Sequence, residues 1–338
     1  MKRLKAAVIG CGAIAHNCHL PGFQKNKWCD LIAVADPSTE NLKKAHEKFK
    51  IEKAYTDPLE MLETERPDAV TVCSPNKYHA EQAIAALNLG CHVLCEKPLC
   101  VSMKEANAIK KAADKAGTIF MVAFSNRLYK GNIVAKKALD AGKIGEPFMI
   151  RIRFAHEGPS PGWAMSDWFY NPEKAHGGAL FDMGIHAIDL AAYYFGKITH
   201  INAMVGTLAK KIAMEDNAIL QFRFASGKLG YAEVGWTSKQ GFAGVEINGS
   251  DGALVVDYSD SVQLVTGSTN PSGKRVIRKK VIEKNPTAGG WPIEIDHFVD
   301  AIRKNKQPEM GLQAGIDSLR VALGAYDSDK KGKTIVVG

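Results

Sequence analysis

Lys97 is a charged residue at a position where core packing alone does not explain a charged side chain. It follows the apolar run 92–95, within the sequence Cys95-Glu96-Lys97-Pro98. A lysine at the carboxyl end of a buried strand loses part of its hydration, so its pKa can shift and its ammonium can meet an anion or a substrate hydroxyl. Ligands of open α/β sheets also bind at such strand ends. The alternative is an ordinary surface turn after a strand.

A second candidate group consists of Asp182 and His186, which lie four residues apart in the segment 177–189. On a helix this spacing places both on one face, so they can reach the same substrate. Histidine has a pKa suited to taking a proton from a hydroxyl while hydride leaves the carbon, and a nearby carboxylate can orient the ring. Gly177-Gly178 permits close backbone approach before the helix. The alternative is a hydrogen-bonded histidine on a buried helix face, with Asp189 capping or pairing locally.

The amino-terminal segment has the features of a dinucleotide-binding turn. A strand expected over residues 4–9 runs into Gly10-Cys11-Gly12-Ala13-Ile14-Ala15, which fits the pattern G-x-G-x-x-(G/A). The first glycine allows the tight turn and the second lets a pyrophosphate approach the backbone. The helix that follows then points its amino terminus at the phosphate charge.

Asp36 completes this pattern, because it ends a second strand expected over residues 31–35. An acid about 20 residues beyond the glycine loop accepts hydrogen bonds from the adenosine ribose hydroxyls. Its charge repels a 2′-phosphate, and Pro37-Ser38-Thr39 offers no arginine to neutralise one. The sequence therefore predicts NAD as the cofactor, with NADP less favoured.

The first 124 residues alternate strands with helices, which predicts an α/β fold with a doubly wound, mainly parallel sheet. Further strands are expected over residues 69–73, 92–95 and 119–124, and helices from Asp57-Pro58, His79 and Ser102. Residues 125–338 predict a second, α+β domain, and the resemblance of the chain to a known family implies that this domain binds substrate and forms the oligomer. Its short runs of alternating residues are typical of a large, open, mostly antiparallel sheet. These runs cover residues 148–154, 198–205, 217–224, 228–237, 244–248, 253–258 and 276–282, with hairpin turns at Ser226-Gly227 and Asn248-Gly249.

Together these residues resemble the Gfo/Idh/MocA family of oxidoreductases, which includes glucose-fructose oxidoreductase and inositol 2-dehydrogenase. The resemblance spans essentially the whole chain and rests on the segments 10–15, 74–79, 96–98 and 177–189. It implies that Lys97, Asp182 and His186 form the catalytic group. It also implies a homodimer or homotetramer in which another subunit covers the open sheet. The cofactor-binding residues that follow from the motifs and the resemblance are Gly10, Gly12, Ala13, Ile14, Asp36, Ser74, Pro75, Asn76, His79, Glu96, Lys97 and Arg127.

The predicted reaction is reversible hydride transfer between NAD and a secondary alcohol of a sugar, a sugar derivative or a cyclitol. His186 is the expected general base, Lys97 the cation that polarises the oxygen, and Asp182 the group that orients both; Lys97 and His186 could exchange roles. A polyol offers hydroxyls and C–H faces, so charged groups with aromatic walls suit it. The expected substrate-binding residues are Lys97, His156, Trp168, Asp182, His186 and Trp291, whereas Trp163 could equally be a core or subunit contact.

Composition excludes several other classes of protein. The net charge of +8 arises from basic pairs spread along the chain, which suits an anionic dinucleotide and predicts no nucleic-acid partner. No apolar run approaches the roughly 20 residues that cross a bilayer, so no membrane partner is expected. The seven cysteines are odd in number and contain no C-x-x-C pair, which predicts reduced thiols, a cytoplasmic protein and no metal site.

Two other functions use the same fold. Some relatives are glycosidases that oxidise the substrate transiently, eliminate the leaving group and return the hydride, with no net redox change. Stoichiometric NADH production distinguishes a dehydrogenase from such an enzyme. A non-catalytic NAD-sensing regulator is a third possibility, but it would need no proton-transfer group such as Lys97, Asp182 and His186.

Overall fold

The computed structural model describes residues 2–160, 162, 164, 166–239 and 242–338. These residues form two compact units, each with its own sheet. The first unit comprises Met1–Phe124, Pro159–His176 and Trp291–Leu319, and the second comprises Ser125–Gly158, Gly177–Gly290 and Arg320–Gly338. The first unit thus adds two later segments to residues 1–124. The assignment of separate functions to domains 1–124 and 125–338 stays a prediction.

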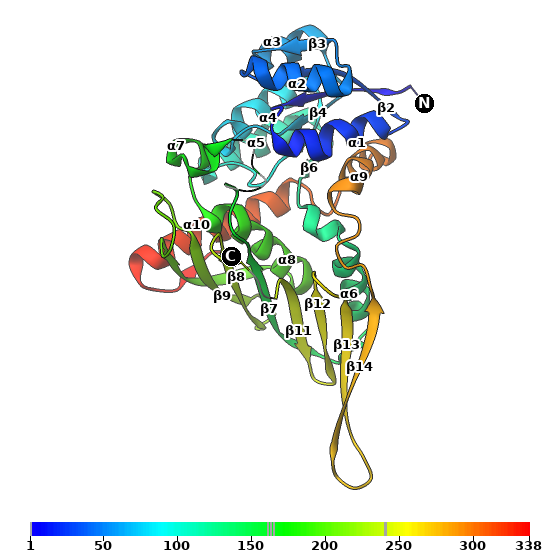
Figure 1. Cartoon of the computed structure of the whole chain (residues 1–338), viewed down its shortest axis with the longest axis vertical. Helices are drawn as coiled ribbons and strands as arrows, with labels where there is room; N and C mark the ends of the chain where they lie inside the picture. Colours follow the sequence, from blue (N-terminus) through cyan, green and yellow to red (C-terminus); the bar gives the residue numbers. More distant parts are fainter. Residues whose placement is uncertain (1, 161, 163, 165, 240–241) are drawn as a thin grey trace. The chain divides into compact units, whose positions relative to one another are not determined.

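The first unit contains a six-stranded parallel sheet in the order β3-β2-β1-β4-β5-β6 (Figure 1). This is the strand order of a doubly wound dinucleotide-binding sheet, so the predicted fold is confirmed. Apart from the exposed edge strand β3, the strands are largely buried runs in which alanine and valine are frequent, as expected for a sheet covered on both faces. Their bounds are β1 Leu4–Ile9, β2 Cys29–Ala35, β3 Lys53–Tyr55, β4 Ala69–Val72, β5 His92–Cys95 and β6 Phe120–Val122.

The helices of the first unit begin at side chains that satisfy their free backbone amides. Ser38, Asp57 and Ser102 each accept a hydrogen bond from an amide of the first turn of α2, α3 and α5. The glycine loop leads first into a short π-helical turn, η1 (Ala15–His19), and only then into α1. The helices are α1 Leu20–Lys25, α2 Thr39–Phe49, α3 Pro58–Glu65, α4 His79–Asn88, α5 Met103–Ala116, α7 Pro172–Ala175 and α9 Trp291–Lys304.

The second unit contains a nine-stranded sheet in the order β14-β13-β12-β11-β7-β10-β9-β8-β15. Every pairing in it is antiparallel except that of β7 with β10, which confirms the predicted α+β architecture. Buried and exposed residues alternate along β9 and β10, so one face of the sheet is packed and the other is open. The strands are β7 Pro147–Ala155, β8 Ile198–Gly206, β9 Asn217–Phe224, β10 Leu229–Gly235, β11 Gly244–Gly249, β12 Gly252–Asp257, β13 Val262–Thr269, β14 Arg275–Glu283 and β15 Ile335–Val336.

The sheet differs from the sequence-based expectation in several details, one of which is the short strand β15, which was not expected. β13 was not expected, because its polar residues and Gly267 interrupt the alternation that identifies a half-buried strand. Asn248-Gly249 is wrong as a hairpin turn: both residues belong to β11, and the turn to β12 consists of Ser250-Asp251.

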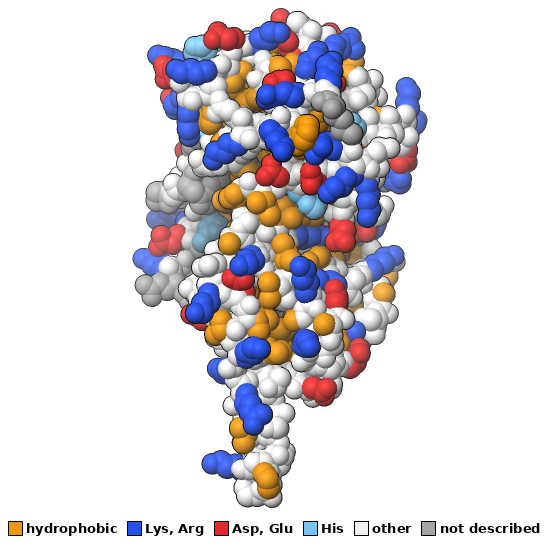
Figure 2. All heavy atoms as spheres, turned by 90° about the vertical axis from the view of Figure 1, so that its right-hand side faces the viewer, with side chains coloured by type: hydrophobic (Ala, Val, Ile, Leu, Met, Phe, Trp, Pro, Cys, Tyr) orange, Lys and Arg blue, Asp and Glu red, His pale blue; other side chains and the backbone are white. Residues whose placement is uncertain are grey.

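Helices α6 (Lys130–Asp140) and α8 (Ile185–Phe195) pack against strands of the nine-stranded sheet. The last helix, α10 (Leu312–Lys331), contributes its first residues to the first unit and the rest to the second. No helix in the described part of the chain is long and apolar enough to cross a membrane. At the far edge of the sheet, β13 and β14 extend as a long hairpin, and Figure 2 shows basic side chains along it.

His92 gives the first unit a pH-sensitive hydrogen bond. Its Nδ1 accepts the amide N–H of Ile119 at 2.9 Å. Burial lowers the pKa of His92, and the carboxylate of Asp68 opposes this only in part. At pH values between the lowered pKa of His92 in the folded chain and its ordinary pKa in the unfolded chain, the unfolded chain binds more protons than the folded chain. The free energy of unfolding therefore falls as the pH drops below about 6.5, and this loss is complete below the folded-state pKa.

We expect the variant His92→Asn to show a weaker dependence of stability on pH, because an asparagine carbonyl can accept the Ile119 amide without titrating. The measurement is urea-induced unfolding at several pH values between about 7.5 and 5.5. His200→Asn, on β8 of the second unit, serves as the control. Equal pH slopes for the wild type and His92→Asn would contradict this account of His92.

Candidate active site

The glycine loop after β1 fits closely against the end of β4. Gly10 has φ +88°, and a Cβ atom there would lie 2.7 Å from the backbone of Cys73 and Ser74, so only glycine fits. Gly12 differs, because a Cβ atom added to it meets nothing within 4 Å. The protein thus leaves open space in front of Gly12, where a pyrophosphate can approach the backbone. This arrangement fits the diphosphate of a dinucleotide.

Asp36 lies beside this loop, at the end of β2. Its Oδ2 accepts the amide of Cys11 at 2.7 Å, and its Oδ1 accepts the amide of Ser38 at 2.8 Å. The Asn41 side chain donates to the same carboxylate at 3.2 and 3.3 Å. The carboxylate is therefore fixed in position at the loop, with accepting capacity left for ribose hydroxyls. Its negative charge disfavours a 2′-phosphate.

His79 holds together the two loops that follow β4 and β5. Its Nδ1 lies 2.7 Å from the carbonyl oxygen of Pro98, and its Nε2 lies 2.8 Å from that of Ser74. Burial lowers the pKa of His79, and the hydrogen bonds to the two carbonyl oxygens oppose this shift only in part. Near it, Ser74 donates to Gln82 and Asn76 donates to the carbonyl of Ala175. The segment 74–79 is thus firmly bonded within the protein, and its contact with the cofactor stays a prediction.

Lys97 follows β5, in the same unit as the glycine loop. Its side chain is half-buried, and its backbone amide donates to Oε2 of Glu96 at 3.1 Å. The other oxygen of Glu96 contacts Nε2 of His19 at 2.9 Å. The Lys97-Pro98 peptide bond is cis. Glu96 is therefore anchored at the turn that carries Lys97.

Asp182 and His186 belong to the second unit and are both buried, with exposed fractions of 7% and 9%. His186 lies in the first turn of α8, whereas Asp182 lies in a π-helical turn, η5 (Leu180–Gly184). The expectation that a regular α-helix carries both residues is therefore wrong, although the chain stays helical from one to the other. The indole N–H of Trp236 donates to Oδ2 of Asp182 at 3.1 Å and fixes its carboxylate. Such π-turns are frequent at functional sites.

A buried acid, Glu215, holds the chain that leads to Asp182. Its Oε1 accepts the amides of Gly178 and Leu180 at 2.7 and 3.1 Å and the hydroxyl of Tyr326 at 2.7 Å. A Cβ atom on Gly178 would lie 2.0 Å from the Glu215 carbonyl oxygen, which explains a glycine there. Neither Glu215 nor Trp236 could be identified from the sequence, because each acts on residues far away along the chain.

Two further predicted residues have defined partners in the second unit. Nε2 of His156 lies 3.1 Å from the sulfur of Met183, the residue next to Asp182. Arg127 pairs with the buried carboxylate of Asp189 at 2.6 and 2.8 Å. The expected local capping or pairing of Asp189 is thus wrong, because its partner Arg127 lies 62 residues earlier in the chain. A contact of Arg127 with the cofactor stays a prediction.

The remaining aromatic candidates belong to the first unit. Trp168 stacks on Phe169 with ring centroids 3.8 Å apart, and Trp291 begins α9 with 47% of its surface exposed. Trp163 lies outside the described residues. Lys97, Trp168 and Trp291 thus come from one unit, and His156, Asp182 and His186 from the other. That they form one catalytic and substrate-binding site stays a prediction.

Both halves of the chain match known sequence families. Residues 4–124 match a family described as "Oxidoreductase family, NAD-binding Rossmann fold", and residues 133–255 match the "GFO/IDH/MocA C-terminal domain". The NAD-binding assignment agrees with the open space at Gly12 and the position of Asp36.

Named relatives cover almost the whole chain. It is 27% identical over 338 residues to myo-inositol 2-dehydrogenase of Thermotoga maritima, which covers 98% of each chain. It is 26% identical over 340 residues to scyllo-inositol 2-dehydrogenase (NAD(+)) of Bacillus subtilis, covering 98% of this chain and 96% of the relative. Among solved structures, levoglucosan dehydrogenase in complex with NADH and L-sorbose matches with a TM-score of 0.86, 25% identity and full coverage of both chains.

We expect the variant Gly12→Ala to bind NAD at least about tenfold more weakly, a loss of ~1.4 kcal/mol, because the new methyl group fills the space that the pyrophosphate needs. Its thermal stability should stay close to that of the wild type, since no protein atom lies within 4 Å of the new Cβ. Calorimetric titration with NAD and thermal unfolding measure the two quantities.

Gly10→Ala is the matched comparison, because its Cβ would collide with the backbone after β4. This variant should lose thermal stability as well as NAD affinity. An unchanged dissociation constant for Gly12→Ala would show that the pyrophosphate does not bind at this loop.

Proposed function

Because the chain belongs to the Gfo/Idh/MocA family of oxidoreductases, we propose that it transfers hydride between NAD and a secondary alcohol of a sugar, a sugar derivative or a cyclitol. The observation that carries the proposal is the open approach to Gly12 beside the fixed carboxylate of Asp36, in a unit that also presents Lys97 at a strand end. The two inositol dehydrogenases and the levoglucosan dehydrogenase among the relatives support a polyol substrate.

Bound NAD supplies the hydride acceptor. We assign to the Lys97 ammonium a hydrogen bond to the reacting oxygen, which stabilises negative charge there and lowers the pKa of the alcohol. His186 takes the hydroxyl proton, and Asp182, held by Trp236, orients the substrate and the histidine. His156, Trp168 and Trp291 are the proposed lining of the substrate site. Lys97 and His186 could exchange their roles.

Two related proposals concern reaction class and location. The named relatives are dehydrogenases, so a glycosidase that uses NAD only transiently is not favoured. All seven cysteines are free and buried, which supports a reducing compartment, and we propose the cytoplasm.

We expect Lys97→Met to lower kcat/KM by about 100-fold or more with little change in NAD affinity, because the methionine keeps the bulk but cannot stabilise the oxygen charge. NADH absorbance measures turnover with a panel of inositols, sugars, sugar acids and aryl glycosides. Lys104→Met, an exposed lysine at the start of α5, is the control and should keep wild-type activity.

Turnover of Lys97→Met within about twofold of wild type would exclude Lys97 as the group that polarises the oxygen. Release of an aryl leaving group without lasting NADH would instead favour the glycosidase. These two outcomes are independent of each other.

We also propose a homodimer or homotetramer that forms through the open face of the nine-stranded sheet. Three large apolar side chains are exposed on this face, on the neighbouring strands β9 and β10. They are Ile219, Leu229 and Tyr231, with exposed fractions of 53%, 42% and 41%. Ion pairs of Arg153 with Glu233 and of Arg151 with Glu246 lie beside them. A mixed apolar and charged sheet face of this kind suits a self-complementary interface.

We expect the double variant Ile219→Asp, Tyr231→Asp to be a monomer, because carboxylates facing their own copies across a symmetric interface repel each other. Light scattering during size-exclusion chromatography measures the mass. Leu59→Asp, on α3 of the first unit, is the control for placing an aspartate at an exposed apolar position away from this sheet. A monomeric wild type would overturn the proposed assembly.

A further inference from the structure

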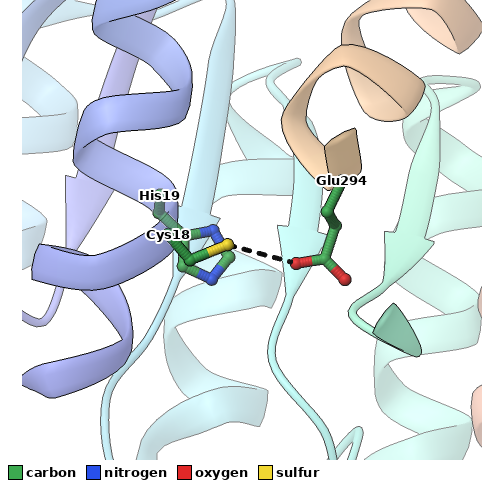
Figure 3. Close-up of side chains that lie close together, drawn as sticks. All are labelled: Cys18, His19 and Glu294. Atoms are coloured by element: carbon green, nitrogen blue, oxygen red, sulfur yellow. Dashed lines mark hydrogen bonds between the residues drawn. The ribbon is translucent and has the colours of Figure 1, made fainter. Parts of the chain in front are cut away.

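We propose that Cys18, His19 and Glu294 form a binding site for a zinc ion inside the first unit. The Cys18 sulfur, a ring nitrogen of His19 and a carboxylate oxygen of Glu294 all lie within 4.8 Å of one another. Figure 3 shows the three side chains pointing toward one another, two from the turn η1 and one from α9. The Cys18 sulfur is 3.8 Å from Oε2 of Glu294.

The site is fully buried, and its polar atoms are incompletely satisfied. His19 and Glu294 are both 0% exposed, and Cys18 is 3% exposed. Nδ1 of His19 and Oε1 of Glu294 have no hydrogen-bond partner among the described residues. Buried polar atoms nearly always have partners, so these two unsatisfied atoms leave unused binding capacity on His19 and Glu294.

Glu96 orients His19 in the way that carboxylates commonly orient metal-binding histidines. Its Oε1 lies 2.9 Å from Nε2 of His19, and an N–H at Nε2 donates to this carboxylate. The lone pair is then on Nδ1, the ring nitrogen that has no protein partner. A histidine that ligates a metal through one nitrogen commonly donates to a carboxylate through the other, which fixes its tautomer and raises its basicity.

The donor set of one sulfur, one imidazole nitrogen and one carboxylate oxygen is typical of zinc. Zinc–ligand bonds of about 2.0–2.3 Å place tetrahedral donors roughly 3.3–3.8 Å apart, so the group contracts on binding, and its three donors leave the fourth position open. The thiol of Cys18 now donates to the carbonyl of Trp291 at 3.2 Å. On binding, the sulfur–hydrogen bond breaks, the sulfur–zinc bond forms and the proton leaves to solvent, so zinc affinity should rise with pH.

This proposal replaces the sequence-based expectation that the chain has no metal site. That expectation relied on the absence of a C-x-x-C pair, whereas these ligands come from one adjacent pair and from a residue 276 positions later. The site does not depend on the proposed dehydrogenase reaction.

The full-length protein, stripped of metal by a chelator, should bind one Zn²⁺ per chain in competition with a chromogenic chelator. Co²⁺ used as the probe should give a near-ultraviolet band from thiolate-to-cobalt charge transfer. Cys18→Ser should abolish this band, and Glu294→Gln should weaken Zn²⁺ affinity by at least about tenfold. Cys91→Ser is the matched control, because Cys91 is also buried and its thiol donates to a backbone carbonyl, that of Pro67, at 3.1 Å.

The absence of a charge-transfer band in the folded wild type would overturn the proposal, and Glu294 would then be a buried, protonated acid. Equal weakening by Cys91→Ser would overturn it as well, because the effect would be general loss of packing. Circular dichroism of each variant checks folding. The wild-type cobalt spectrum and Glu294→Gln decide the question if Cys18→Ser does not fold.

Discussion

Parallel pairing of β1 with β2 and β4, and of β4 with β5, is the constraint on which the rest of the first unit depends. Parallel strands bring all their carboxyl ends to one edge of the sheet, so loops far apart in the sequence become neighbours. The glycine loop, Asp36, the segment after β4 and the Glu-Lys-Pro turn all follow such ends. Short bonds then fix the loops to one another, as Asp36 does with Cys11 and His79 does with Pro98.

The second unit positions its predicted catalytic residues differently, because they lie on a helical segment rather than at strand ends. Glu215 holds the start of that helix through two backbone amides, and Trp236 fixes the carboxylate of Asp182. Both supporting residues precede or end strands of the large sheet. The sheet therefore positions the helix as well as packing against it.

Local signals made the first unit largely predictable. Residues 4–9 and 92–95 are mainly apolar runs followed by glycine or a charged residue, and both are strands with the expected bounds. Asp57-Pro58 and Ser102 were identified as helix starts from capping chemistry alone. Contacts over long sequence separations could not be predicted in this way. Trp236 bonds Asp182 across 54 residues and Cys18 meets Glu294 across 276, and neither pair has a local pattern.

The late position of α9 in the sequence also affects how the first unit folds during synthesis. α9 packs against α1 so closely that Gly22 has no room for a side chain beside Ile295, and Asn26 donates to Asp296. At a synthesis rate of about 5–20 residues per second, α9 leaves the ribosome roughly 10–30 seconds after the strands of the first unit. During that interval the surface of α1 that later meets α9 is exposed on the nascent chain. The first unit therefore completes its fold only after α9 has been synthesised.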